Sequence, residues 1–308
     1  MPKRLEGVLP IVHTPFTADD EIDRVALKRE IEFIVRVGSQ GYGTGMVSEL
    51  LRLTADERLK YTELLVELAA ERVAVFVSVG AESTKQAVLY AKHAERAGCD
   101  AVMAVPPLSV RLGAAALADY YRALAEAISI PVIVQDASGY VGQAIPLSVY
   151  EQLLARFDEE KIVFKPEASP IGPNLSALRD ATGGKARIFE GSGGIHLVDS
   201  FRRGVAGTMP GVDLLDAVVA LWKALERGDD AAIYALSFPI SAIVALQLQA
   251  GLDGFLAIEK HLLVKRGIFT DARRRKPYSW DLDWETAAEV DRLYALLTDV
   301  LPTPGIGR

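Results

Sequence analysis

The sequence predicts a closed (β/α)8 barrel of the TIM-barrel class, followed by a C-terminal helical extension. Short apolar runs alternate eight times with longer amphipathic ones along the chain, as strands and helices do in a parallel barrel. Half of the 308 residues are hydrophobic, which is enough to build one large core. A doubly wound open sheet is the alternative, but no glycine-rich dinucleotide loop opens a helix after the first strand.

The eight predicted strands are short and apolar. Prolines, glycines and polar residues bound them, as expected for buried parallel strands. In chain order they cover residues 8–12, 41–45, 73–79, 101–105, 131–135, 162–164, 187–190 and 207–209.

The predicted helices follow from apolar spacing and from capping residues. Thr54 and Glu57 form a capping box that opens a helix running to about residue 72, Ser83 caps the next one, and Asn174 is a plausible N-cap for a later one. The barrel helices are expected over residues 23–37, 54–72, 83–98, 113–128, 147–157, 175–182, 195–203 and 214–227.

About 80 residues follow the last barrel helix, so we divide the chain into a catalytic barrel, residues 1–228, and an extension, residues 229–308. The extension is expected to contain three helices, over residues 230–250, 254–266 and 284–301. A polar, basic-then-acidic connection, residues 271–283, joins the last two. Its run of arginines, 273–275 with Lys276, is interpreted as a solvated or subunit-facing charge run.

Composition argues against several function classes. The net charge of −7 argues against a nucleic-acid partner and leaves no basic stripe for a membrane. No apolar run appears long enough to span a membrane, and residues 1–6 lead into no signal-type apolar core, so a soluble, cytoplasmic protein is expected. The only cysteine, Cys99, can form no internal disulfide, and the four histidines show no metal-ligand spacing.

Barrels of this kind carry their chemistry at the carboxyl ends of the strands. One of these ends carries a lysine, Lys165, which follows a buried apolar run and is itself followed by Pro166. Loss of hydration there favours a neutral amine, which can attack a ketone. The plainer interpretation is that Lys165 ends the strand and pairs with Glu167. Other strand ends place further candidates at the same rim: Thr14, Met46, Val47, Ser48, Gln135, Gly191, Ser192 and Met209.

The order of these motifs resembles the dihydrodipicolinate synthase/N-acetylneuraminate lyase family of class I aldolases and dehydratases. The likeness covers nearly the whole chain. It rests on the opening strand and loop through Thr14-Pro15-Phe16, on Gly45-Met46-Val47-Ser48-Glu49, on residues 91–100, on Lys165 and on Arg275-Lys276-Pro277.

The resemblance implies a function for the site. Lys165 falls where the family has its Schiff-base lysine, so a small 2-oxo acid substrate is expected, with no metal and no organic cofactor. Met46, Val47 and Ser48 occupy the family motif that holds the substrate carboxylate. Related barrels are commonly tetramers, so the resemblance also implies a homo-oligomer, most simply a homotetramer.

The departures from the family pattern are as informative about function as the similarities. Gln135 stands where the family usually has a tyrosine that acts as general acid/base, and an amide cannot exchange a proton at neutral pH. Tyr140 replaces the arginine that grips a second carboxylate in the synthase branch. We therefore expect a Schiff-base aldolase or dehydratase that is not a dihydrodipicolinate synthase. Either the Tyr140 phenol replaces the missing shuttle, or Tyr140 only packs over the pocket or against a neighbouring subunit.

Two alternatives stay open. One is a dehydratase of the same family acting on a sugar acid. The other is a non-catalytic, ligand-binding barrel that has lost the tyrosine shuttle.

Overall fold

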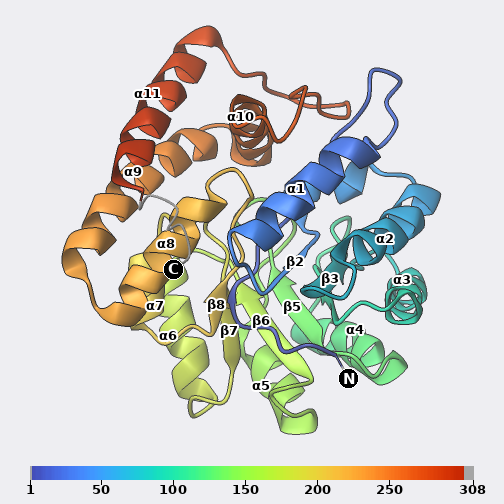
Figure 1. Ribbon diagram of the computed structural model, residues 1–308. Helices are drawn as coiled ribbons and strands as arrows, with labels where there is room; N and C mark the ends of the chain where they lie inside the picture. Colours follow the sequence, from blue (N-terminus) through green and yellow to red (C-terminus); the bar gives the residue numbers. More distant parts are fainter. Residues whose placement is uncertain (1, 302–308) are drawn as a thin grey trace.

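The computed structural model describes residues 2–301 and shows eight parallel strands surrounded by helices (Figure 1). The strands pair in the order β1-β8-β7-β6-β5-β4-β3-β2, and bridges from Ile11 to Gly43 and Gly211 close the barrel. The predicted fold class is therefore confirmed. The strands are β1 (Gly7–Val8), β2 (Gly41–Gly43), β3 (Ala74–Ser78), β4 (Ala101–Ala104), β5 (Val132–Asp136), β6 (Ile162–Pro166), β7 (Arg187–Glu190) and β8 (Gly207–Thr208).

Helices follow the strands as predicted, with two short 3-10 turns after β2. The barrel helices are α1 (Arg24–Arg36), α2 (Ala55–Ala69), α3 (Thr84–Ala97), α4 (Ala114–Ala127), α5 (Leu147–Arg156), α6 (Ile171–Ala181), α7 (Leu197–Arg202) and α8 (Leu215–Arg227). The 3-10 turns are η1 (Met46–Ser48) and η2 (Leu50–Arg52). The capping box is present, since Thr54 accepts from the Glu57 N–H and Glu57 from the Thr54 N–H.

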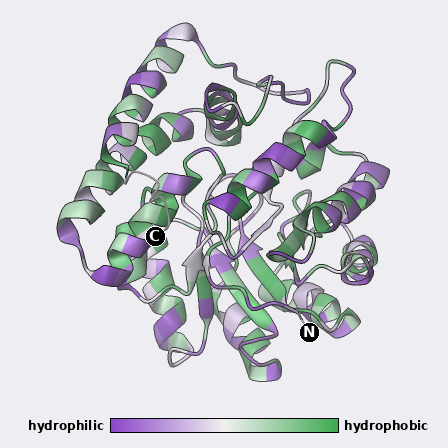
Figure 2. Ribbon diagram, viewed as in Figure 1, coloured by the Kyte–Doolittle hydropathy of each residue, from purple (hydrophilic) through white to green (hydrophobic). Residues whose placement is uncertain are grey.

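Apolar side chains fill the inside of the barrel. Phe76, Met103, Ile133, Val163 and Phe189 are fully buried in one cluster there. The strands are largely hydrophobic, whereas the helices alternate hydrophobic and hydrophilic residues (Figure 2). Such patterning lets each helix cover the sheet with one face and meet water with the other.

The extension forms three helices, α9 (Asp230–Leu248), α10 (Gly251–Lys265) and α11 (Trp284–Val300). The helix α9 packs against α8, α10 and α11, and α10 contacts η1 after β2 (Figure 1). By length and composition α9 could cross a membrane, which corrects the expectation that no apolar run reaches that length. Its packing among three helices is equally compatible with a core element.

Three local predictions need correction. β1 ends at Val8, short of the predicted residue 12, although Leu9 and Ile11 still donate to the carbonyls of Thr208 and Pro210; Pro10 and Pro210 have no N–H with which to complete regular pairing there. Helix α6 begins at Ile171, so Asn174 is inside the helix and not its cap; its side chain donates to the Ala168 carbonyl. Arg274 and Arg275 are buried, not solvated: Arg274 pairs with Asp281, and Arg275 pairs with Asp20 and Glu57.

Buried charges hold the extension against the barrel. Lys260 of α10 is fully buried, and its Nζ lies 2.5 Å from Glu49 Oε1. The same ammonium donates to the carbonyls of Thr14 and Arg273, while Glu49 Oε2 accepts from the Arg275 N–H. Neither charge reaches water, so each depends on these partners.

We expect Lys260→Met to lower the free energy of unfolding by about 3–5 kcal/mol, because it leaves the buried Glu49 carboxylate with only Arg52, 3.3 Å away, as its cationic partner. Adding Glu49→Gln should recover much of that loss. Urea denaturation measures both, and Lys223→Met on the exposed face of α8 serves as the control. Equal free energies of unfolding for the single and double variants would show that the Lys260–Glu49 ion pair does not account for the loss of stability.

Candidate functional site

A small cavity of about 40 Å³ lies at the carboxyl ends of the strands, beneath α10. Of the residues predicted to form the site, seven line it: Met46, Val47, Gln135, Tyr140, Lys165, Gly191 and Met209. The other lining residues include Glu167 from the loop after β6 and Leu252, Phe255 and Glu259 from α10. The extension therefore contributes directly to the cavity wall.

Lys165 and Glu167 form an ion pair beside the cavity. Lys165 Nζ lies 2.8 Å from Glu167 Oε2, and both side chains are almost completely buried. Gln135 is the register partner of Lys165 on β5, and its Nε2 donates to Glu167 Oε2 at 2.8 Å. A Cβ on Gly191 would come within 2.7 Å of both side chains, so only glycine leaves them room there.

Glu167 is the functional candidate that sequence reasoning treated only as a possible partner of Lys165. Residues two apart on a strand point to the same side, and this spacing was the available signal. Burial raises the pKa of Glu167, against the opposing pull of Lys165 and Gln135. A carboxyl group with a raised pKa beside an amine is suited to exchange protons with it.

Tyr140 reaches the same cavity from the loop after β5. Its ring meets Phe255 edge-on with centroids 5.7 Å apart. Burial, with contributions from Glu167, Glu190 and Glu259, raises its pKa well above the usual value. The phenol therefore stays protonated, and it can donate a proton or a hydrogen bond more readily than it can act as a base.

The three predicted hydroxyl ligands do not line the cavity. Thr14 Oγ1 donates to the Ser48 carbonyl and Ser48 Oγ donates to the Val12 carbonyl, so both hydroxyl groups are hydrogen-bonded to the backbone. Ser192 Oγ accepts from the His196 N–H. The segment Gly191–Gly194 is a turn, and α7 begins three residues later at Leu197. Substrate binding by these hydroxyls stays a prediction.

A second carboxylate, Glu259, lines the cavity from α10. His13 Nε2 lies 2.7 Å from Glu259 Oε2, and His13 Nδ1 lies 3.0 Å from Glu30 Oε1. Burial alone would lower the pKa of His13, but Glu259 and Glu30 outweigh it and raise the pKa to about 10. His13 therefore favours its protonated form between two acidic side chains, one of which, Glu30, has its own pKa raised by burial.

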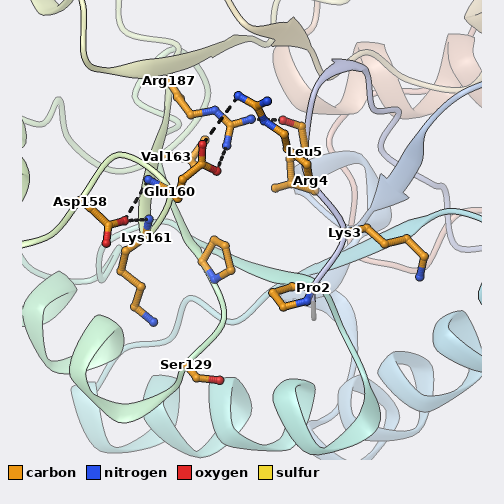
Figure 3. Close-up of a pocket in the computed structure, with 11 residues that line it drawn as sticks. Pro2, Lys3, Arg4, Leu5, Ser129, Asp158, Glu160, Lys161, Val163 and Arg187 are labelled. Atoms are coloured by element: carbon orange, nitrogen blue, oxygen red, sulfur yellow. Dashed lines mark hydrogen bonds and ion pairs between the residues drawn. The ribbon is translucent and has the colours of Figure 1, made fainter.

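A wider hollow, of about 450 Å³, lies at the other end of the barrel (Figure 3). Its charged groups are already paired: Glu160 meets Arg4 and Arg187, and Lys161 Nζ donates to the carbonyls of Ile128 and Ile130. It lies near the starts of the strands, away from Lys165. Within residues 2–301, no group of three His, Cys, Asp or Glu side chains is arranged to hold a metal ion.

Comparison with known proteins places this geometry in a family. The model of the dihydrodipicolinate synthetase family matches residues 4–279. L-2-keto-3-deoxyarabonate dehydratase of Azospirillum brasilense is 30% identical over 298 residues, covering 93% of each chain. The 4-hydroxy-tetrahydrodipicolinate synthase of Methanosarcina mazei is 30% identical over 243 residues, covering 78% of this chain and 81% of the relative.

A solved structure agrees with these matches. Dihydrodipicolinate synthase from Rhodopseudomonas palustris superposes with a TM-score of 0.83 at 27% identity, covering 95% of this chain and 98% of that one.

The imidazolium of His13 predicts a pH dependence of stability. Its pKa rises from 6.5 to about 10 on folding. The contribution of His13 to the free energy of unfolding is therefore complete below pH 6.5 and is lost as the pH rises through about 10. Since one pKa unit corresponds to about 1.4 kcal/mol, we expect the free energy of unfolding to fall by several kcal/mol between pH 7 and 10.

Urea denaturation across this range measures the fall. His13→Gln should flatten it, whereas His93→Gln, at a half-buried histidine, should not. An NMR titration of the His13 ring with a midpoint near 6.5 would contradict the assignment.

Proposed function

Because the chain belongs to the dihydrodipicolinate synthetase family, we propose that it is a Schiff-base lyase acting on a 2-oxo acid, with Lys165 as the nucleophile. One observation carries the proposal. The Lys165 amine borders a largely enclosed cavity, with the Glu167 carboxyl 2.8 Å away to take up its proton. A deprotonated amine is the form that attacks a ketone.

The covalent step is a condensation. The neutral Lys165 nitrogen adds to the C2 carbonyl. One of its two protons and the proton taken up by Glu167 go to the departing oxygen, and water leaves as the iminium, which keeps the second N–H, forms. The substrate carboxylate would rest on the N–H groups of Met46 and Val47. These amides open η1, and the first N–H groups of a helix have no partner within it.

Glu167 is suited to the proton transfer that follows. The iminium draws electrons from C3, and the Glu167 carboxylate can remove a C3 proton to give an enamine. Loss of the C4 hydroxyl as water then needs a proton, which Glu167 or the neutral Tyr140 phenol can supply. Hydrolysis of the new iminium returns the amine and releases an unsaturated 2-oxo acid.

Dehydration of a sugar acid is the second, more specific candidate. It is supported by the likeness to L-2-keto-3-deoxyarabonate dehydratase over 93% of each chain. Lys165 is the only cationic side chain lining the cavity among the described residues, so a second substrate carboxylate has no evident partner. For that reason we favour dehydration or aldol cleavage over dihydrodipicolinate synthesis.

A ligand-binding barrel without catalysis is less well supported. That alternative rested on the missing proton shuttle, and Glu167 offers a replacement beside the amine. The homo-oligomer, the cytoplasmic location and the division at residue 228 stay predictions.

Borohydride reduction tests the nucleophile directly. With pyruvate present, reduction should add mass to the peptide containing Lys165, and Lys165→Ala should abolish both the adduct and turnover. Lys161→Ala serves as the control, because Lys161 donates to two carbonyls at the other end of the barrel. An adduct on Lys161 or Lys260 would refute the assignment.

Two substitutions test the proton transfer. We expect Glu167→Gln to lower turnover by about a hundred- to ten-thousandfold, because it removes the acid/base while keeping the shape. Tyr140→Phe should lower it less, with adduct formation at Lys165 intact. Glu190→Gln is the matched control, since Glu190 is buried at the end of β7 but does not line the cavity. Full turnover in Glu167→Gln would contradict the role of Glu167.

A further inference from the structure

The cavity presents hydrogen-bond acceptors that no protein donor satisfies. Gln135 lines it, and Gln135 Oε1 is buried without a partner among the described residues. The amide cannot be turned around to correct this, because its Nε2 must face the Glu167 carboxylate, 2.8 Å away. A buried acceptor without a donor is costly, so Gln135 Oε1 indicates a donor supplied by the ligand.

Glu259 provides the second acceptor. Its Oε2 is held by His13 at 2.7 Å, whereas no donor from residues 2–301 reaches its Oε1. A Cβ on Gly211 would lie 2.6 Å from Glu259 Oε1, so the glycine after β8 makes room for this carboxylate at the rim. Gly191 makes room for Lys165 and Glu167 in the same way after β7. The two carboxylates thus enter one cavity at neighbouring strand ends.

Two further titratable side chains, His13 and Asp213, flank Glu259. His13 is fully buried and bridges Glu259 to Glu30, so the imidazolium is committed to these two carboxylates. Asp213 lies on the same side of Gly211 as Glu259, since its Oδ1 would be 2.7 Å from a Cβ there, and burial and the nearby Glu259 raise its pKa to about 7. No cation other than Lys165 lines the cavity within the described residues. A negatively charged ligand tail would therefore meet no positive group beside Glu259 except His13, which Glu259 Oε2 already contacts.

We propose that Glu259 determines which 2-oxo acids the site accepts: its Oε1 accepts hydrogen bonds from hydroxyl groups beyond the reacting carbon, and its charge excludes a tail that ends in a second carboxylate. This inference rests on the proposed function and names the substrate class, a 2-oxo acid with a neutral, hydroxylated tail. His13 and Glu30 are positioning residues that hold Glu259 in place.

Selection of this kind has two parts. Hydroxyl donors satisfy acceptors that are otherwise unpaired, and a site built for such donors rejects ligands that lack them. A like charge in a buried site adds a repulsive element against the wrong ligand. Both parts act through the tail, so the 2-oxo acid head at Lys165 should be bound equally well without them.

Three 2-oxo acids distinguish binding of the 2-oxo acid group, here called the head, from binding of the rest of the carbon chain, here called the tail. Pyruvate has the head alone, 2-keto-3-deoxypentonate has a hydroxylated five-carbon chain, and 2-oxoglutarate has five carbons ending in a carboxylate. The measurement is the concentration of each acid that gives half-maximal borohydride-trapped adduct at Lys165, in the wild type and in Glu259→Gln. Glu259→Met, which keeps the length without charge, is the second variant.

In the wild type, the pentonate should be trapped at the lowest concentration and 2-oxoglutarate at the highest. In Glu259→Gln, we expect the half-maximal trapping concentration of the pentonate to rise by about tenfold, since a hydrogen bond to a charged group is worth at least that factor. The half-maximal concentration of 2-oxoglutarate should fall by about the same factor. Glu259→Met should show the larger rise for the pentonate. The value for pyruvate, which has no tail, should change less than either of the other two values.

The outcomes distinguish the two proposals. An unchanged ratio of pentonate to 2-oxoglutarate in both variants overturns the role of Glu259 while leaving the Schiff base intact. Loss of the pyruvate adduct together with the others also overturns it, because Glu259 would then support the whole site. Absence of any adduct in the wild type overturns the proposed function, and this inference with it.

Discussion

The structure depends on buried charges that are satisfied only when α10 is seated on the carboxyl end of the barrel. Lys260 and Glu49 are fully enclosed and 2.5 Å apart, although 211 residues separate them in the chain. An unpaired charge in such a place would cost several kcal/mol. The next residue of α10, Glu259, meets His13 in the same way. These two contacts fix the rotation and height of α10, and thereby complete the cavity wall.

Much of the architecture could be predicted because its causes are local. Each strand–helix unit shows its own apolar period, and Thr54 and Glu57 lie three residues apart, so a capping box is visible in the sequence. The position of Lys165 near the end of a buried strand could be predicted because an apolar run precedes it and Pro166 follows it in the sequence. Residues whose roles depend on distant partners could not be found in this way. His13 and Glu259 are 246 residues apart, and the arginines at 274 and 275 resemble a solvated run until Asp281, Glu57 and Asp20 are seen beside them.

The predicted hydroxyl ligands Thr14 and Ser48 contact backbone carbonyls for a common physical reason. Hydroxyl residues at strand ends suggest ligand binding, but Thr14 and Ser48 lie where the chain turns sharply and backbone carbonyls need donors. Buried polar backbone groups are almost always paired, and the nearest hydroxyl commonly supplies the partner. The same rule makes Gln135 Oε1 informative, since it is an exception within the cavity. Residue type alone cannot separate these cases.

Glu167 and Glu259 are proposed to have different roles, in proton transfer and in substrate selection, because they belong to different parts of the fold. Glu167 lies two residues after Lys165, immediately past the end of β6, and Gln135 of the neighbouring β5 donates to it, so the pair is held by the barrel itself. Glu259 belongs to the extension and is oriented by His13 and Glu30. A change in α10 can therefore alter which ligand tails are accepted while leaving the amine and its proton partner undisturbed. In a barrel whose strands carry the reaction, an added helix that reaches the mouth is a direct means of changing the substrate without rebuilding the chemistry.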